Sequence, residues 1–159
     1  AGVLAYLQFF YSPLKDELEF FGVDQRHESD IEGLGRIPAE QQLKSDKVPS
    51  FNVIGNSPLV LRESLLDEVY TMGENFVEAA KRVVSPGMNG PFCIEGVYDE
   101  NAKFRSFEFS ARIVAGSNIY MDGSPYYSLL FNEPMSMGKR IAREIKTATE
   151  SNQLDKITT

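Results

Sequence analysis

The sequence predicts an α+β domain in which helices pack on a mixed, mostly antiparallel sheet. Apolar and aromatic runs come in pairs joined by short polar turns, which is typical of β-hairpins. Two other segments carry apolar residues at helical spacing. Strands and helices alternate without the regular rhythm of a parallel sheet. At 159 residues, the chain has the length of one domain with a single core.

The first hairpin is expected at the start of the chain. Residues 3–11 are apolar, aromatic and almost uncharged, so they predict a buried strand. A turn begins at Ser12 and Pro13, and residues 18–23 predict the returning strand. Residues 24–36 are dense in charge, so we expect a loop there. A short helix after residue 38 and a short strand over residues 51–54 follow.

The clearest helix covers residues 65–84. Its apolar residues recur at steps of three or four, which places them on one stripe that faces the core. They are Leu61, Leu65, Val69, Met72, Phe76, Ala80 and Val83. Ser64 with Asp67 predicts an N-cap and its partner, and the segment Ser85-Pro86-Gly87 ends the helix.

A second hairpin and a second helix complete the predicted fold. Residues 92–98 and 104–113 predict two strands joined by a polar turn. A loop rich in glycine, serine and asparagine covers residues 115–125. A final amphipathic helix covers residues 136–149.

The second hairpin contains the most informative polar pattern. Because side chains alternate along a strand, the return strand has two distinct faces. Its polar face carries Glu108, Ser110 and Arg112. Its apolar face carries Phe107, Phe109 and Ala111, and we expect this face to be core. The polar face then looks into a cleft or into solvent.

Glu95 lies within an apolar run on the outgoing strand, where an unpaired carboxylate costs free energy. If the hairpin turns at residues 101–102, Glu95 lies opposite Glu108 and Tyr98 lies opposite Arg105. Residues that are directly opposite have Cβ atoms about 4.5–5.5 Å apart. Two carboxylates at that separation repel each other.

A divalent cation would remove this repulsion. Magnesium is commonly held by one or two carboxylates while substrate phosphates complete its shell, which fits the Glu95–Glu108 pair. Alternatively, both acids lie on a solvated face of the sheet and pair with Arg105 or Lys103. The pattern leaves both interpretations open.

The remaining polar candidates give weaker signals. His27 is the only histidine, and one histidine cannot build a usual zinc site. No Ser-His-Asp triad is convincing, and we expect His27 on an exposed loop. Cys93 has no basic neighbour and is expected to be buried and unreactive. Glu28 contributes only if its loop lines a cleft. Asn56 lies in a predicted turn, and its amide can both donate and accept hydrogen bonds.

The composition indicates which classes of binding partner and which cellular compartment to expect. The net charge of −7 and the absence of a basic stripe argue against a nucleic-acid partner. No run approaches the roughly 20 apolar residues that span a bilayer, so no membrane partner is expected. A single cysteine fits a reducing compartment, and we expect a cytoplasmic protein. The chain starts at Ala1 without Met, inside a predicted strand, so we expect further residues upstream.

The segment from Phe107 to Arg112 resembles the Glu-x-(Asn or Ser)-x-Arg strand of the ATP-grasp superfamily, whose acid binds the magnesium of ATP. Further stretches are similar to the archaeal-type formate-dependent AICAR ligases, which formylate a purine precursor. These stretches are Phe10 to Leu14 with Arg26 to Ser29, Pro86 to Cys93, and Gly123 to Tyr126 with Glu133 to Lys146. The similarity covers essentially the whole chain.

This resemblance implies the C-terminal portion of an ATP-grasp fold, without the amino-terminal domain and most of the lobe that covers the ATP phosphates. It implies that formate, ATP and AICAR give FAICAR, ADP and phosphate through formyl phosphate. Glu95 and Glu108 become ligands of magnesium or manganese, Glu28 an ATP contact, Asn56 an AICAR contact and Arg112 a phosphate partner. A homo-oligomer is also implied.

Two other functions stay open at this level. A related ATP-grasp ligase for another acid and amine would keep the same metal-binding strand. A non-catalytic assembly module would instead use the apolar first strand and the aromatic segment 120–131. Alone, the chain is expected to hold half of an ATP site and to be inactive.

Overall fold

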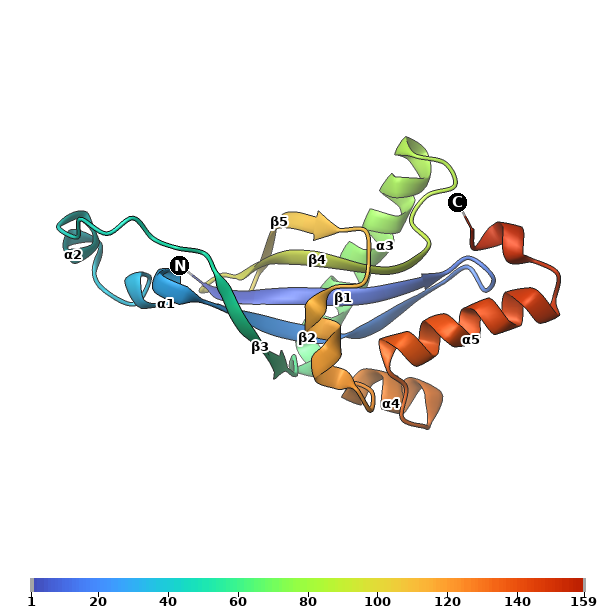
Figure 1. Cartoon of the computed structure of the whole chain (residues 1–159). Helices are drawn as coiled ribbons and strands as arrows, with labels where there is room; N and C mark the ends of the chain where they lie inside the picture. The colour runs from blue at the N-terminus through green and yellow to red at the C-terminus, as the bar shows by residue number, and fades with distance from the viewer. Residues whose placement is uncertain (1, 159) are drawn as a thin grey trace.

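The computed structural model describes residues 2–158, and it contains a single sheet of five strands with helices on both faces (Figure 1). The strands are β1 (Val3–Ser12), β2 (Glu17–Glu28), β3 (Val53–Leu59), β4 (Gly90–Tyr98) and β5 (Phe104–Ser110). Their order is β3-β2-β1-β4-β5, and every neighbouring pair is antiparallel. The predicted α+β class is confirmed.

Helices of very different length connect and cover these strands. The α-helices are α1 (Ser29–Leu34), α2 (Ala39–Leu43), α3 (Leu66–Val83), α4 (Pro125–Phe131) and α5 (Met137–Glu150). The 3₁₀ turns are η1 (Glu63–Leu65), η2 (Ala115–Tyr120) and η3 (Leu154–Lys156). Within residues 2–158, no helix combines the length and the apolar character that crossing a membrane requires.

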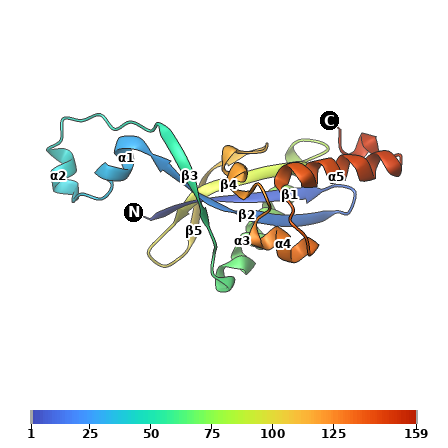
Figure 2. The ribbon, with the colours of Figure 1, turned by 60° about the horizontal axis from the view of Figure 1, so that its bottom comes forward.

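The two faces of β1 build two separate clusters. Its alternate residues Ala5, Leu7, Phe9 and Tyr11 join a core with Val69 and Val77 of α3. On the other face, Phe10 packs in a second cluster with Tyr120, Tyr127, Met135 and Met137. In Figure 1, α3 crosses behind the strands and η2 passes in front of them. Figure 2 shows α1 and α2 at the end of the sheet remote from α5.

A buried ion cluster attaches α5 to the sheet. Arg140, only 1% exposed, contacts Glu19 of β2 at 2.8 Å and Glu144 at 2.7 Å. Tyr127 donates to Glu19 at 2.8 Å, and Ser12 donates to Glu144 at 2.6 Å. Burial lowers the pKa of Arg140, but the hydrogen bonds to both carboxylates outweigh this effect and raise it. Each charge therefore has the partners that a buried ion requires.

Two predicted loops are wrong. Residues 24–28 continue strand β2, because β3 pairs with this part of β2 and hydrogen-bonds its backbone. Residues 29–34 form α1. Strand β3 itself runs to Leu59, further than the predicted short strand. Residues 115–120 form η2, and α4 begins at Pro125, where Ser124 accepts a hydrogen bond from the Tyr127 backbone.

The predicted long helix is confirmed, but its cap is not. Helix α3 spans Leu66–Val83, close to the predicted bounds. Its N-cap is Leu65, which makes no side-chain capping bond, so the prediction of a Ser64 cap is wrong. The 3₁₀ turn η1 leads directly into α3 and supplies backbone hydrogen bonds at this end instead.

The prediction that the aromatic face of β5 is core is also wrong. Phe107 is 58% exposed and Phe109 is 57% exposed. Strand β5 lies at the edge of the sheet, where the ring of Phe76 from α3 lies 5.0 Å from that of Phe109. An apolar groove of about 430 Å³ remains between β5 and the end of α3, beside Val83 and Met88.

We expect Arg140→Ala to destabilise the chain by about 3–5 kcal/mol, because it leaves the buried Glu19 carboxylate without its counter-ion. Urea unfolding followed by circular dichroism measures this change. Arg143→Ala is the matched control on the same helix, since Arg143 is 41% exposed and pairs with Glu133 at the surface. The control should cost under about 1 kcal/mol. Equal losses in both variants would contradict a structural role for the buried cluster.

Candidate functional site

The strand register brings a row of polar side chains together across four strands. Tyr6 of β1 lies opposite Asp24 of β2 and opposite Glu95 of β4. Glu95 in turn lies opposite Glu108 of β5. Because directly paired residues of an antiparallel sheet point to the same face, these four side chains share one face.

The predicted pairing of Glu95 with Glu108 is confirmed, whereas the predicted pairing of Tyr98 with Arg105 is wrong. A β-bulge after Glu95 shifts the register by one residue, so Arg105 lies opposite Val97. Without the bulge, the register at the turn would place Glu95 opposite Phe107, so the extra residue on β5 brings Glu108 opposite Glu95.

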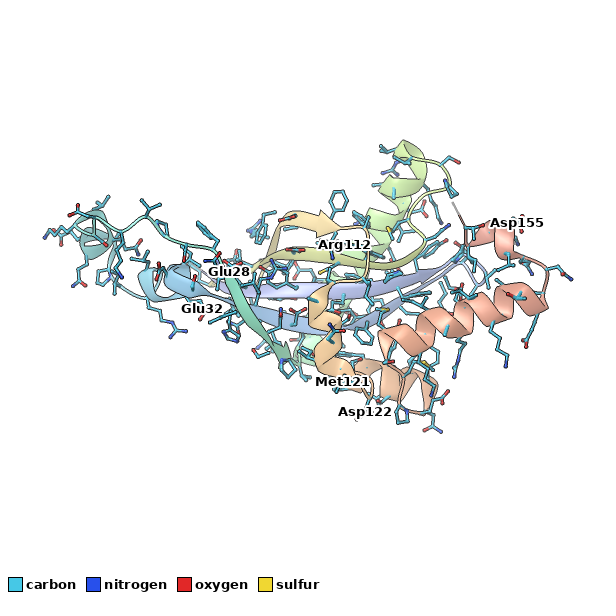
Figure 3. All side chains as sticks on the ribbon, in the orientation of Figure 1. Glu28, Glu32, Arg112, Met121, Asp122 and Asp155 are labelled. Carbon is cyan, nitrogen blue, oxygen red and sulfur yellow. The ribbon has the colours of Figure 1, made fainter. Side chains whose placement is uncertain are left out.

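Two adjoining cavities open on this face. The larger, of about 500 Å³, is lined by residues that include Glu28, Glu95 and Glu108. The smaller, of about 240 Å³, is lined by residues that include Asn56, Glu95 and Arg112. All five site residues expected from the sequence therefore border one of the two cavities. In Figure 3, Glu28 lies near α1, and Arg112 lies nearer the middle of the sheet.

Three residues belong to the walls of both cavities: Tyr6, Arg26 and Glu95. Glu95 is buried and accepts hydrogen bonds from Ser110 at 3.0 Å and, at the longer distance of 3.5 Å, from Arg26. The Arg26 guanidinium lies 4.2 Å from the centre of the Tyr6 ring. Burial, assisted by the Glu95 charge and opposed by Arg26, raises the pKa of Tyr6 to about 12.

The alternative partners predicted for the two acids are wrong. Arg105 pairs with Asp99 at 3.2 Å, and Lys103 lies 3.9 Å from Glu68. Both cations belong to the turn side of the hairpin, where Arg105 lies opposite Val97 and Phe104 lies opposite Tyr98.

Asn56 and Asp24 form the floor of the smaller cavity. Asn56 lies opposite Arg26, and its side-chain amide donates to Asp24 at 2.6 Å. Asp24 is 1% exposed and also accepts from the Gln8 amide. Burial raises the pKa of Asp24, although both amide bonds oppose the shift. Because Asp24 holds the amide nitrogen of Asn56, the carbonyl oxygen is the atom that Asn56 can offer to a ligand.

Two further predictions concern His27 and Cys93. His27 lies on β2 and not on a loop. Its Nδ1 lies 2.9 Å from the Glu32 carboxylate, and its Nε2 lies 2.9 Å from the Ser57 hydroxyl. It is therefore partly buried and partnered, and it lines neither cavity. Cys93 is buried as predicted, and burial raises the pKa of its thiol far above its usual value.

Sequence reasoning missed Tyr6, Asp24 and Arg26. Asp24, Arg26 and Glu28 occupy every second position after an apolar run, which is the signature of a strand with one polar face. The density of charge around them favoured a loop instead. Tyr6 carries no such signal, because it lies in a continuous apolar run that predicts burial alone.

Comparison with known proteins identifies the family. A family described as a domain of unknown function, DUF1297, matches residues 1–159. The chain belongs to the DUF1297 family.

Three relatives of this DUF1297 chain have the same name. A Nitrosopumilus maritimus protein is 90% identical over 159 residues, and a Cenarchaeum symbiosum protein is 73% identical over 158 residues. Both are named 5-formaminoimidazole-4-carboxamide-1-(beta)-D-ribofuranosyl 5'-monophosphate synthetase. A Methanocaldococcus jannaschii protein of the same name is 52% identical over 151 residues, 95% of this chain and 42% of the relative.

A solved structure confirms the fold. The structure of an IMP biosynthesis protein PurP from Thermococcus kodakaraensis matches all of this chain and 50% of its own, with 37% identity and a TM-score of 0.83. The first two relatives are covered to 47% and 46% of their length, against 100% and 99% of this chain. The DUF1297 chain thus spans about half the length of the proteins that it matches.

We expect Gly116→Ala to destabilise the chain by about 1–3 kcal/mol, because a methyl group at position 116 would overlap the buried Asp24 carboxylate. Gly55→Ala is the matched control, since no heavy atom lies within 4 Å of a methyl group placed there. It should change stability by less than about 0.5 kcal/mol. Urea unfolding of both variants measures the difference, and similar midpoints would disprove the close packing of η2 on Asp24.

Proposed function

We propose that this chain is the C-terminal half of an ATP-grasp ligase of purine biosynthesis. The complete enzyme joins formate to the amine of AICAR and converts ATP to ADP and phosphate. One observation carries the proposal. The acids, amide and arginine that the family resemblance singles out border two adjoining cavities on one face of the sheet.

The relatives support the same conclusion. A chain that is 90% identical over its full length to a named synthetase retains the side chains of the corresponding half almost completely. The relatives' printed name describes the formylated product of this reaction, and IMP biosynthesis is the context printed for the solved PurP structure.

The donor set fits a magnesium or manganese ion. Glu95 and Glu108 supply carboxylate oxygens from directly opposite positions on neighbouring strands. Within residues 2–158, no group of three or more histidine, cysteine or acidic side chains is arranged to hold a metal. Two carboxylates together with phosphate oxygens are a usual magnesium environment. A bound ion would neutralise phosphate charge at this position.

Three further side chains would contact the substrates. Glu28 lies at the wall of the larger cavity and can accept a hydrogen bond from ATP. Asn56, oriented by Asp24, offers a carbonyl oxygen to an amino group of AICAR in the smaller cavity. Arg112 lines the smaller cavity and can donate to a phosphate. Positioning and charge neutralisation are the main needs of phosphoryl transfer, so no protein nucleophile is required.

A cytoplasmic location and a homo-oligomeric complete enzyme belong to the same proposal. ATP and formate are small soluble substrates, and the single buried cysteine fits a reducing compartment. A related ligase with another acid and amine is the main enzymatic alternative. Binding of AICAR, but of no other ribonucleotide amine, by the chain joined to its upstream half would exclude that alternative.

An assembly role is a second candidate, and one observation favours it. Phe109 is exposed and, with Ala111, lines an apolar groove of about 430 Å³. Exposed apolar patches commonly mark interaction surfaces. This surface lies on the opposite side of β5 from Glu108, so an interface there is compatible with an active ligase.

An assay of ADP release tests the proposed reaction. ADP release that depends on both formate and AICAR is measured for this chain alone, and for the chain joined to the upstream half of the Nitrosopumilus maritimus relative. We expect turnover only in the joined protein, because the chain spans about half the length of its relatives. Robust turnover by the chain alone would contradict the division of the site. Absence of turnover in the joined protein would contradict the proposed reaction.

Glu108→Gln in the joined protein tests the metal site. Removing one of two carboxylates should weaken magnesium-dependent ADP binding by at least about tenfold, because the lost charge leaves the ion with a single acidic ligand. Isothermal titration calorimetry measures the affinity, and circular dichroism checks the fold. Glu100→Gln, in the exposed hairpin turn, is the control and should bind normally. Unchanged binding by Glu108→Gln would favour the assembly role.

A further inference from the structure

The two cavities meet at one basic side chain. Among the described residues, Arg36 lines only the larger cavity and Arg112 only the smaller, whereas Arg26 lines both. In the proposed reaction, ATP and the amine occupy different cavities, and the acid must react with each of them in turn. Its position is therefore the shared wall, where Arg26 lies beside Tyr6 and Glu95.

We propose that Arg26 binds the carboxylate of the one-carbon acid and then the phosphate oxygens of the acyl phosphate. This inference rests on the proposed function and assigns a residue to the acid substrate of the same site. A planar guanidinium presents paired N–H donors that match a carboxylate or a phosphate, which a lysine ammonium cannot do.

The contacts of Arg26 leave its guanidinium available to an anion. Its Cζ lies 4.2 Å from the centre of the Tyr6 ring, and this cation–π contact helps to position the group. Its one carboxylate contact among residues 2–158 is Glu95, at 3.5 Å through Nη2. That distance is long for a charge-assisted hydrogen bond, which is usually about 2.7–2.9 Å. The side chain is 27% exposed, so it reaches the cavity space.

The other arginines of the cavities are less suitable. Arg112 is exposed, and its Nη1 donates to the Ile113 backbone carbonyl at 2.9 Å. Arg36 is 79% exposed and pairs with Glu32 at 3.4 Å. Neither lies on the wall that separates the two cavities. An exposed cation also attracts an anion less, because water screens its charge.

The step balances without any further reactant. A carboxylate oxygen of formate forms a bond to the γ-phosphorus of ATP, and the bond from that phosphorus to the bridging oxygen breaks. ADP leaves with the electron pair, and formyl phosphate remains. The AICAR amine then bonds to the formyl carbon, phosphate leaves with the electrons of the carbon–oxygen bond, and the nitrogen loses one proton. Arg26 offsets the negative charge of the acid before and after the transfer.

Arg26→Gln in the joined protein tests the inference. We expect the KM for formate to rise roughly 10- to 100-fold, as for loss of a hydrogen bond to a charged group. The KM values for ATP and AICAR should stay within about twofold, because these substrates bind mainly elsewhere. Arg26→Lys keeps the charge without the planar fork and should give an intermediate KM for formate.

Arg105→Gln is the matched control, because Arg105 is 70% exposed and pairs with Asp99 outside both cavities. It should leave all three KM values unchanged. An unchanged KM for formate in Arg26→Gln and Arg26→Lys overturns the inference. A rise in the KM for magnesium-ATP alone also overturns it, because Arg26 would then only position Glu95. If the unsubstituted joined protein makes no FAICAR, the proposed function fails and this inference fails with it.

Discussion

Strand β1 is paired along both edges and buried on both faces, and the rest of the structure depends on this double burial. Alternation along β1 sends Leu7 and Phe9 toward α3. The alternate residues Tyr6, Gln8 and Phe10 face the opposite side. The second face therefore carries the candidate site at one end and the attachment of α5 at the other. Strand β1 thus separates the candidate site from the place where α5 attaches to the sheet.

The polar clusters at the two ends of this face differ in how completely they are satisfied. Around Arg140, every buried charge has close partners, with contacts of 2.7 and 2.8 Å to two carboxylates. Among residues 2–158, Glu95 has one cation contact, with Arg26 at 3.5 Å, although Glu95 is only 3% exposed. A satisfied cluster stabilises the fold, whereas a loosely partnered buried acid next to a cavity gains from a ligand or ion. On the same face of the sheet, the cluster around Arg140 therefore stabilises the fold, whereas the cluster around Glu95 belongs to the candidate site.

The edge strand β5 connects the site with a possible interface. It contributes Glu108 to the wall of the larger cavity, while Phe109 stays exposed beside the apolar groove. Phe107 also belongs to the wall of the larger cavity. A segment that covered both Phe107 and Phe109 would thus lie next to the proposed ATP site. This arrangement agrees with a chain that spans about half the length of its relatives.

The sequence alone determined the α+β class, the two hairpins and the long helix, because these follow from local periodicity and turn spacing. The predicted pairing of Glu95 with Glu108 is correct, but it depends on a β-bulge that the turn spacing did not predict. Only the tertiary structure decided that Asp24 and Arg26 lie on a strand, since their pairing with β3 overrides local charge density. It also decided that Phe109 stays exposed, because apolar alternation shows which residues share a face but not whether another element covers that face.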